Sequence, residues 1–383
     1  MTQLKLREID SVDELREAAP AWDRLWQRSE VSLPTARAEL VAQWIEHFAH
    51  RRGGPARLRV LVVEKGQDFA AAVPLVRRRT YRTLPVGDLT WNCWSPNGEL
   101  LLDPDADAPA VLDVLASGLE KTPWPLLWFD LVPFETPRWQ SLIQALASRG
   151  LATDVHPRYC IGQVEIRGRF DAYFAQRPKA QRQSVGKGLR RLQRDGPVEL
   201  KVCADPGPDE IDQRLREAFE IENRGWKKAA GGTVLGTPGM FEFYRRQARQ
   251  LAAWGYLRLA LLEHRQKPIA FEFGWTAKGV YYSFKVGYDA AYRRYGPGHL
   301  LRMRLIAALH DRPGPALVDF QGPLTDALRH WSTRSYPIGR LVIAPRRLGS
   351  RALMTGYRSL APVIRGLRGS RGPSASAAPG STR

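Results

Sequence analysis

The chain has 383 residues, of which 44% are hydrophobic and twelve are tryptophan, and this is enough for two or three folded domains. Its formal net charge of +19 at pH 7 indicates anionic partners, such as a nucleotide cofactor, RNA or anionic lipid. Its three cysteines, Cys93, Cys160 and Cys203, are too far apart in sequence for a Cys-x-x-Cys zinc site or a paired disulfide framework, so we expect reduced thiols and no metal.

The amino terminus and the hydropathy of the whole chain predict a soluble, cytoplasmic protein. Charged residues stand where a signal peptide would need an apolar segment: Arg7, Glu8, Asp10 and Asp13. No uninterrupted apolar run is long enough to span a membrane.

The first elements predicted along the chain are a helix and a β-hairpin. Leu40, Val41 and Trp44 lie at helical spacing, and Ile45 and Phe48 continue the same face. The apolar segment 58–65 then leads through a short polar turn into a second apolar run, Phe69 to Val76, as a hairpin would. The loop that follows, Trp91 to Gly98, is rich in aromatic and turn residues.

The second half of the chain repeats this pattern. Residues 257–266 share Leu, Arg, Glu and Gln with residues 58–67 at an offset of 257 − 58 = 199, and a second apolar run, Ile269 to Trp275, follows. A helix precedes both copies, so the chain is interpreted as an internal duplication, with chance similarity of two short hairpins as the alternative. We therefore predict domains at residues 1–155 and 156–345.

Two segments concentrate the positive charge. A helix within 177–194 has an apolar side of Val185, Leu189 and Leu192, and its basic residues form either a solvated face or an anion-binding surface; they are Arg182, Lys187, Arg190, Arg191 and Arg194. The segment 346–383 contains eight arginines and no acidic residue, and we expect a basic tail that is partly disordered.

A strand, a basic loop and a helix at residues 281–309 form the most informative stretch. Arg293-x-x-Gly296-x-Gly298 opens a helix whose apolar side includes Leu300 and Leu301, and the free N–H groups of such a helix start suit a pyrophosphate. A nucleotide P-loop would need Lys-Ser or Lys-Thr after the second glycine, where His299 and Leu300 stand. A dinucleotide fold would need Gly-x-Gly-x-x-Gly early in a βαβ unit. An ordinary helix cap is the remaining alternative.

The motifs together resemble the FemAB-like branch of the GNAT acyltransferases, including its CelD-like members. They are Glu222-Asn-Arg-Gly-Trp226-Lys227, Lys285-Val-Gly-Tyr288-Asp289, Tyr295-Gly-Pro-Gly298 and Asp319-Phe-Gln-Gly322, and the match spans most of residues 20–345. The resemblance implies an α/β (α+β) fold of two tandem GNAT-like domains, each a mixed, mostly antiparallel twisted sheet flanked by helices. Two departures are Gly296, where the family commonly has serine, and Leu328, where it commonly has lysine.

The resemblance also implies roles for individual residues. The acyl-coenzyme A loop would comprise Arg293, Arg294, Tyr295, Gly296, Gly298 and His299. Catalytic candidates are Lys285, Asp319 and Glu222, and acceptor-binding candidates are Trp226, Lys227, Tyr288 and Asp289. Strand alternation places Lys285 on the same face as Tyr281 and Ser283. The first domain lacks the glycine loop, so we expect it to be structural or to line the acceptor groove.

Three functions are consistent with these features. The first is an N-acyltransferase that moves acetyl or another acyl group from coenzyme A to a small-molecule or lipid-linked amine, such as an amino sugar in envelope or exopolysaccharide synthesis. The second uses aminoacyl-tRNA as donor, with 182–194 tracking the RNA phosphates. The third is a non-catalytic basic module that binds nucleic acid or membrane, and in any of them the tail could contact the anionic inner membrane face.

Overall fold

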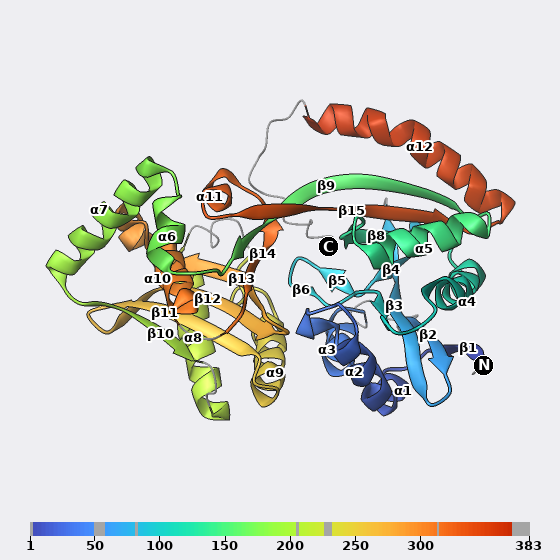
Figure 1. Cartoon of the computed structure of the whole chain (residues 1–383), viewed down its shortest axis with the longest axis horizontal. Coiled ribbons are helices and arrows are strands. Elements are labelled where there is room, and N and C mark those ends of the chain that lie inside the picture. The colour runs from blue at the N-terminus through green and yellow to red at the C-terminus, as the bar shows by residue number, and fades with distance from the viewer. Residues whose placement is uncertain are drawn as a thin grey trace. The chain divides into compact units, whose positions relative to one another are not determined.

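The structure is a computed structural model that describes residues 3–49, 58–80, 83–203, 207–225, 232–311 and 314–369, with side chains as far as Leu360. The chain forms two compact units (Figure 1). Unit 1 comprises Met1–Tyr159 and Pro337–Arg383, and unit 2 comprises Cys160–Tyr336. The first division lies close to the boundary predicted at 155. The structure differs at the other end, because residues 337–345, assigned from sequence to the second domain, belong to unit 1 together with the segment 346–383.

Unit 1 is built on a mixed sheet. Its strands are β1 (Leu4–Ile9), β2 (Leu58–Lys65), β3 (Asp68–Thr80), β4 (Leu84–Leu89), β7 (Leu101–Leu102), β8 (Leu127–Val132), β15 (Arg334–Ala344) and β9 (Ala152–Glu165), the last two of which also extend into unit 2. β1 to β4 are antiparallel neighbours, β4 pairs in parallel with β8, and β8 pairs antiparallel with β15. A small hairpin of β5 (Trp91–Asn92) and β6 (Ser95–Pro96) lies in the aromatic loop.

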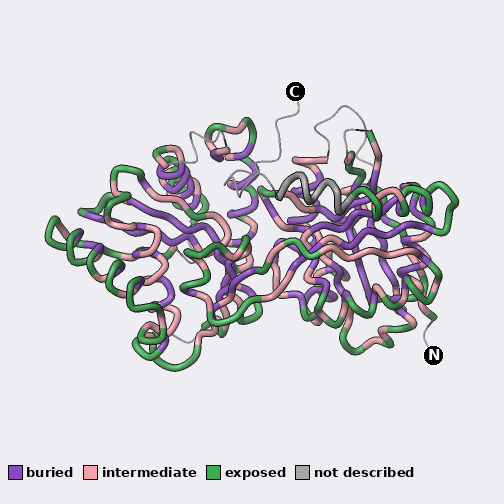
Figure 2. Tube along the Cα trace, turned by 90° about the horizontal axis from the view of Figure 1, so that it is seen from above, coloured by how far each residue is buried: buried purple, intermediate pink, exposed green. Residues whose placement is uncertain are grey.

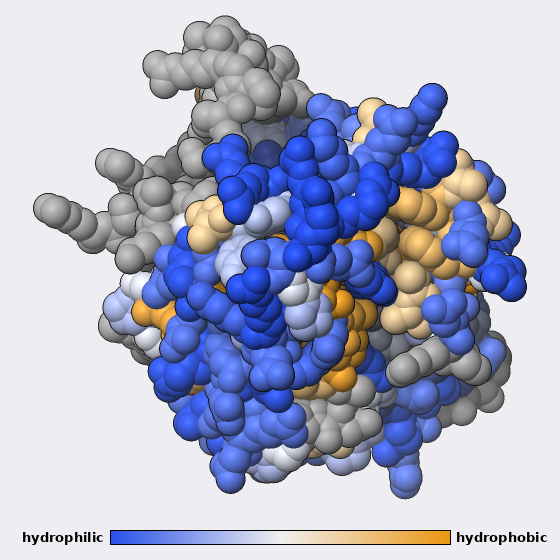
Figure 3. All heavy atoms as spheres, turned by 90° about the vertical axis from the view of Figure 1, so that its left-hand side faces the viewer, coloured by the Kyte–Doolittle hydropathy of each residue, from blue (hydrophilic) through white to orange (hydrophobic). Residues whose placement is uncertain are grey.

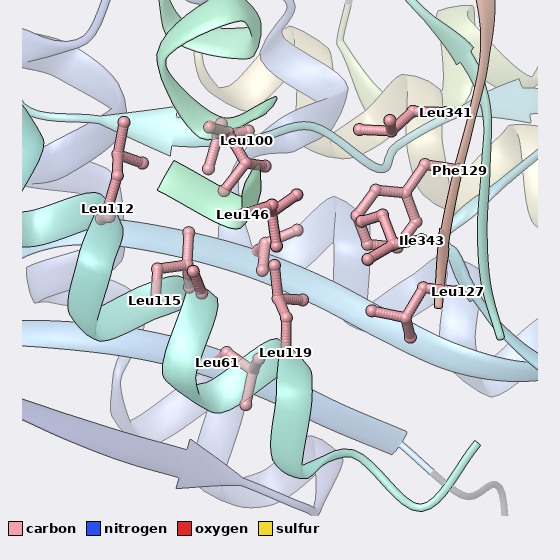
Figure 4. Packing of buried hydrophobic residues seen from close by; sticks show 14 of the residues in the cluster. Leu61, Leu100, Leu112, Leu115, Leu119, Leu127, Phe129, Leu146, Leu341 and Ile343 are labelled. Carbon is pink, nitrogen blue, oxygen red and sulfur yellow. The ribbon is translucent and has the colours of Figure 1, made fainter. Parts of the chain in front are cut away.

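Helices cover both faces of this sheet. They are α1 (Val12–Glu17), α2 (Ala19–Arg28), η1 (Pro34–Ala36), α3 (Ala38–Trp44), η2 (Ile45–Ala49), α4 (Ala108–Lys121), α5 (Pro137–Ser148) and α12 (Leu348–Gly369). Side chains of α4 and α5 pack with strand residues such as Leu127, Phe129 and Ile343 into the main core of the unit (Figure 4). On the opposite face, Met354 of α12 packs against Trp128 in a smaller cluster. The segment predicted as a tail thus begins as a helix that is part of unit 1.

Unit 2 repeats the architecture. Its strands are β10 (Val198–Cys203), β11 (Leu257–His264), β12 (Lys267–Ala277), β13 (Val280–Tyr288) and β14 (Leu317–Pro323), followed by the end of β9. Only β13 and β14 among these neighbours are parallel. Its helices are α6 (Phe170–Ala175), α7 (Lys179–Asp195), α8 (Pro208–Arg224), α9 (Met240–Ala253), η4 (Ala290–Tyr295), α10 (Pro297–His310) and α11 (Asp326–Arg329). The predicted fold class, tandem mixed and mostly antiparallel sheets flanked by helices, is confirmed.

The two faces of the unit 2 sheet have separate cores. Leu300, Leu301 and Leu305 of α10 pack with Leu192 of α7 on one face. On the other, Phe219 of α8 lies 5.4 Å from Tyr244 of α9, measured between ring centroids. In both units the strands are mostly buried while the loops and outer helical turns are exposed (Figure 2). Within the described residues no helix is long and apolar enough to cross a bilayer.

The two predicted hairpins match in detail. In unit 1 the register of β2 with β3 shifts between Val63 and Glu64, and in unit 2 the register of β11 with β12 shifts between Leu262 and Glu263. Both shifts lie at the offset of 199 found in the sequence. Because a β-bulge is fixed by the local chain path, its presence in both hairpins supports the interpretation of the chain as a duplication.

Candidate active site

The two parallel strands of unit 2 separate soon after they pair. Their register runs from Val280 opposite Leu317 to Tyr282 opposite Asp319 and stops there, although β13 continues to Tyr288. A strand edge that has lost its neighbour presents N–H and C=O groups to any extended ligand beside it. The end of the parallel pairing therefore marks a candidate binding edge.

A β-bulge redirects Lys285 at this point. Lys285 pairs with Phe273, but the next pair is Ser283 with Gly274, so that Phe284 is an extra residue. The bulge moves Lys285 to the opposite face from Tyr281, whose hydroxyl donates to Glu272 at 2.9 Å. The prediction that Lys285 shares a face with Tyr281 and Ser283 is wrong for this reason. Glu272, by contrast, is held inside the sheet.

The bulge brings Lys285 to Glu222 at the end of α8. The Lys285 Nζ lies 3.6 Å from Glu222 Oε1, and the two side chains are 11% and 0% exposed. The ammonium also lies 5.3 Å from the ring centroid of Tyr244, a cation–π contact. The other oxygen of Glu222 accepts a hydrogen bond from the N–H of Val234 at 2.9 Å. Two predicted catalytic residues thus form one buried ion pair, which also anchors the start of the chain segment described after 231.

A second contact joins the end of α8 to the end of β13. Arg224 Nε donates to Asp289 Oδ2 at 2.9 Å, and the Asp289 Oδ1 accepts from the N–H of Ala291, which caps η4. Gly225 lies so close to β13 that a Cβ there would be 2.9 Å from the carbonyl oxygen of Tyr288. Both oxygens of Asp289 are therefore engaged in positioning the loop. Trp226 and Lys227, predicted as acceptor contacts, lie outside the described residues.

The predicted glycine loop leads directly into α10. Gly296 is the N-cap, with φ 66° and ψ 47°, a left-handed conformation that favours glycine, and no side chain accepts a hydrogen bond from the first turn. A Cβ at Gly298 would lie 3.6 Å from Tyr288 Cδ1, which is an ordinary contact. The folded chain itself therefore does not require glycine at 298. Pro297 has no N–H, and the N–H groups of His299 and Leu300 donate to the Gly296 carbonyl oxygen at 3.0 and 3.1 Å. The N–H of Gly298 and the dipole of this helix start are therefore what would attract an anion.

The loop carries two exposed arginines and a half-buried histidine. Arg293 and Arg294 are exposed, and Arg294 Nη2 donates to the hydroxyl of Tyr295 at 2.6 Å. His299 Nδ1 accepts a hydrogen bond of 3.2 Å from the indole N–H of Trp331. Burial, and then the charge of Arg302, lowers the pKa of His299.

Asp319 lies where the parallel strands part but makes its contacts elsewhere. Its side chain accepts hydrogen bonds from Gln163 Nε2 at 2.8 Å and from the backbone and side chain of Gln321 at 2.9 and 3.0 Å. Burial raises the pKa of Asp319, against the opposing effect of these donors. The structure thus unites Lys285 with Glu222, whereas Asp319 belongs to a separate cluster on β14, where the pairing with β13 ends.

Sequence reasoning missed three supporting residues. Arg224 lies inside a quoted motif, so its pairing with an acidic residue could have been considered. Tyr244 and Gln163 gave no signal, because they meet Lys285 and Asp319 only through the tertiary fold.

A family model described as an acetyltransferase (GNAT) domain matches residues 179–327, which include Glu222, Lys285, the glycine loop and Asp319. No curated protein matches the chain at a significant level.

Several solved structures share the fold. FemX aligns with a TM-score of 0.56 and 10% identity over 88% of this chain and 96% of that chain. The C-terminal domain of a putative lysylphosphatidylglycerol synthetase from Agrobacterium fabrum aligns at 0.54 and 13%, over 91% of this chain and 97% of that one. A conserved protein of unknown function from Bacteroides thetaiotaomicron gives 0.53 and 12%, over 90% and 100%. Residues 179–327 therefore match the acetyltransferase (GNAT) domain family, and the chain as a whole shares its fold with FemX.

Proposed function

We propose that this protein transfers an acyl group, with acetyl the first expectation, from coenzyme A to the amine of a small-molecule or lipid-linked acceptor such as an amino sugar. The observation that carries the proposal is that one strand of unit 2, β13, connects a free strand edge to a helix start. The β13 edge is released from β14 after Tyr282, and the same strand leads through η4 to the uncapped start of α10.

The two features suit the two ends of an acyl thioester. The pyrophosphate of coenzyme A would bind the N–H of Gly298 at the start of α10, with the side chains of Arg293 and Arg294 adding positive charge. The pantetheine amides would then lie along the β13 edge. A backbone N–H of this edge would donate to the thioester carbonyl, whose oxygen gains negative charge as the amine attacks.

The reaction needs one bond formed and one broken. The amine nitrogen attacks the carbonyl carbon, the C–S bond breaks, the nitrogen loses a proton and the thiolate of coenzyme A gains one. Asp319 is our candidate for proton acceptance, since its raised pKa makes the carboxylate more basic than an ordinary aspartate. Lys285, held by Glu222, would supply positive charge beside the acceptor or the developing oxyanion.

Ligand-dependent stabilisation tests the donor. Acetyl-coenzyme A, longer acyl-coenzymes A and desulfo-coenzyme A should each raise the melting temperature, because a ligand at 100 times its Kd adds about 2.7 kcal/mol to the free energy of unfolding. Release of free coenzyme A thiol on addition of candidate amines then identifies the acceptor. Absence of any stabilisation by all three compounds would remove coenzyme A as the donor.

A second candidate is an aminoacyl-tRNA donor, favoured by the surface of α7. Its basic residues are Lys179, Arg182, Lys187, Arg190, Arg191 and Arg194, and none forms an ion pair with another described residue. A Cβ at Gly188 would lie 2.3 Å from the carbonyl oxygen of Tyr295, so α7 packs directly on the η4 loop. Figure 3 shows that the side of the molecule on which α7 lies is mostly hydrophilic.

RNA binding separates the two donors. Under this second proposal, binding to an aminoacyl-tRNA should survive moderate salt and weaken when Arg190, Arg191 and Arg194 are changed to glutamine, while a coenzyme A donor predicts no such dependence.

A further inference from the structure

One face of the unit 1 sheet carries a band of charged side chains from five strands. Gly87 of β4 pairs with Leu127 of β8 on the face of the main core, so the next residues, Asp88 and Trp128, point to the opposite face. Asp130 follows Trp128 by two residues and shares that face. The band is completed by Arg78 of β3, Arg340 of β15 and Arg158 of β9, and we call these five charged residues the arginine band.

The two aspartates are buried and hold the three arginines. Arg78 Nη1 donates to Asp88 Oδ2 at 2.8 Å. Arg158 approaches both oxygens of Asp130 at 3.3 Å, and Arg340 Nη2 donates to the same carboxylate. The aspartate side chains are 1% and 3% exposed, whereas those of Arg78 and Arg158 are 45% and 43% exposed. Each carboxylate therefore lies beneath its arginines and fixes the direction in which they point outward.

Two indole rings orient the guanidinium groups further. The Arg340 Cζ lies 4.2 Å from the ring centroid of Trp128, and the Arg78 Cζ lies 5.1 Å from that of Trp91. The Trp91 indole N–H itself donates to Asp88 Oδ1 at 3.2 Å. A guanidinium stacked on a ring keeps its N–H groups in the plane, where they are able to reach a ligand.

The arginine band has more positive than negative charge and more N–H donors than its two carboxylates accept. The band has three guanidinium groups against two carboxylates. Asp88 is already saturated, because its Oδ1 also accepts from the N–H of Leu89 at 2.9 Å. The Arg340 Nε has no partner among the described residues but is buried, so the donors that a ligand can reach are those of Arg78 and Arg158, which are 45% and 43% exposed. Planar guanidinium groups with free N–H donors and net positive charge bind phosphoryl oxygens with bidentate geometry.

The neighbouring part of the same face is closed by α12. Tyr357 of α12 lies 5.0 Å from Trp128, between ring centroids, and Met354 is buried beside it. Described side chains of α12 thus cover the apolar end of the face, while Arg78 and Arg158 stay half exposed. We propose that the arginine band is a binding site for a phosphoryl group, separate from the donor loop of unit 2, through which unit 1 binds a ligand of its own.

Titration calorimetry with inorganic pyrophosphate tests the site. The starting protein is the full chain with Gly298→Val, so that binding at the α10 loop is suppressed. In this background Arg158→Gln, and separately Arg78→Gln combined with Asp88→Asn, should each weaken pyrophosphate binding at least about tenfold, since each removes a charge-assisted contact. The double substitution leaves no buried unpaired carboxylate, so the fold should be retained, and circular dichroism checks it.

Arg24→Gln is the matched control, because Arg24 in the same unit pairs with Asp68 at 2.9 Å but the Asp68 side chain is 51% exposed. It should leave pyrophosphate binding unchanged. The proposal is overturned if the background protein binds no pyrophosphate, or if the folded band variants bind it as tightly as the background. This outcome is independent of whether coenzyme A is the donor.

Discussion

Units 1 and 2 share a strand order but differ where their parallel strands meet. In unit 1 the parallel pair is Gly87 with Leu127, and in unit 2 it begins with Val280 opposite Leu317. Two residues further along, unit 1 has Phe129, which is fully buried in the main core, and unit 2 has Asp319 with its network of donors. Next to its parallel pair, unit 1 thus has an aromatic residue packed in the core, and unit 2 has a hydrogen-bonded carboxylate.

The helices that connect the two parallel strands of each unit differ in a corresponding way. In unit 1, α4 begins at an aspartate N-cap, and the Asp107 side chain accepts from the N–H of Ala110. In unit 2, α10 begins at Gly296 and has no side-chain cap. The carboxylate of Asp107 therefore occupies the position on its helix that a ligand phosphate would take on α10. The two units thus share a frame, and a few residues decide whether the helix start is capped by a carboxylate or left without a side-chain cap.

The largest effect should come from Lys285→Met, which removes the charge proposed to act in unit 2. We expect a loss of at least about 100-fold in kcat/KM, the size typical of removing one electrostatic contact to a transition state. Lys201→Met is the control, because Lys201 also pairs with a buried glutamate, Glu263, at 2.7 Å but lies on β10. Steady-state kinetics measure kcat/KM of both variants. Full activity of Lys285→Met would refute a catalytic role of Lys285.

Phe129→Ala tests the proposal that unit 1 contributes packing at this position and does not bind the donor. It should lower the free energy of unfolding by about 3–5 kcal/mol, because a buried aromatic ring is lost from the core shown in Figure 4. Chemical denaturation measures this loss. Donor affinity of the remaining folded protein should not change, and a parallel loss of donor binding would contradict the assignment of the donor site to unit 2.

Gly298→Ala distinguishes an effect on protein stability from an effect on donor affinity. The added Cβ makes only an ordinary contact with Tyr288, so the melting temperature should hardly change. Donor affinity should fall about tenfold, because the methyl group obstructs the approach of a phosphate to the helix start. For comparison, Asp107→Ala in unit 1 should cost about 1 kcal/mol of stability and leave donor affinity intact. Equal donor affinity of Gly298→Ala and the natural protein would contradict the proposal that this loop binds the donor.

Asp319→Asn should give the smallest effect on stability, visible as a change in the pH dependence of the free energy of unfolding. Because burial raises the pKa of Asp319 in the folded protein, its contribution to stability is complete below the unfolded pKa and is lost as pH rises through the folded value. The variant should therefore lose less stability than the natural protein as the pH rises above the pKa of an unfolded aspartate, about 4. Urea denaturation across that range measures the difference, and identical curves would refute it.

Much of the frame could be predicted from the sequence because it depends on local patterns. The duplicated hairpins show period-two alternation and polar turns, and the helix that begins after Gly296 follows from turn residues and apolar spacing. The pairing of Lys285 with Glu222 joins two motifs that the sequence had singled out separately.

The remaining parts of the site depend on long-range geometry. A single extra residue at Phe284 reversed the face of Lys285, and alternation alone gives no warning of such a bulge. Asp319 meets Gln163 across 156 residues of sequence, through strand pairing that no local pattern encodes. Membership of residues 337–360 in unit 1 was missed for the same reason, since charge and composition made the end of the chain resemble a detached tail.

That membership has a consequence for biosynthesis. Leu341 and Ile343 of β15 complete the unit 1 core, yet they leave the ribosome after the whole of Cys160–Tyr336. Unit 2 is continuous in sequence and is able to fold while translation proceeds, whereas unit 1 waits for its last strand with part of its apolar surface uncovered. The half of the molecule made first is thus the half finished last, and chaperone dependence during synthesis should concentrate there.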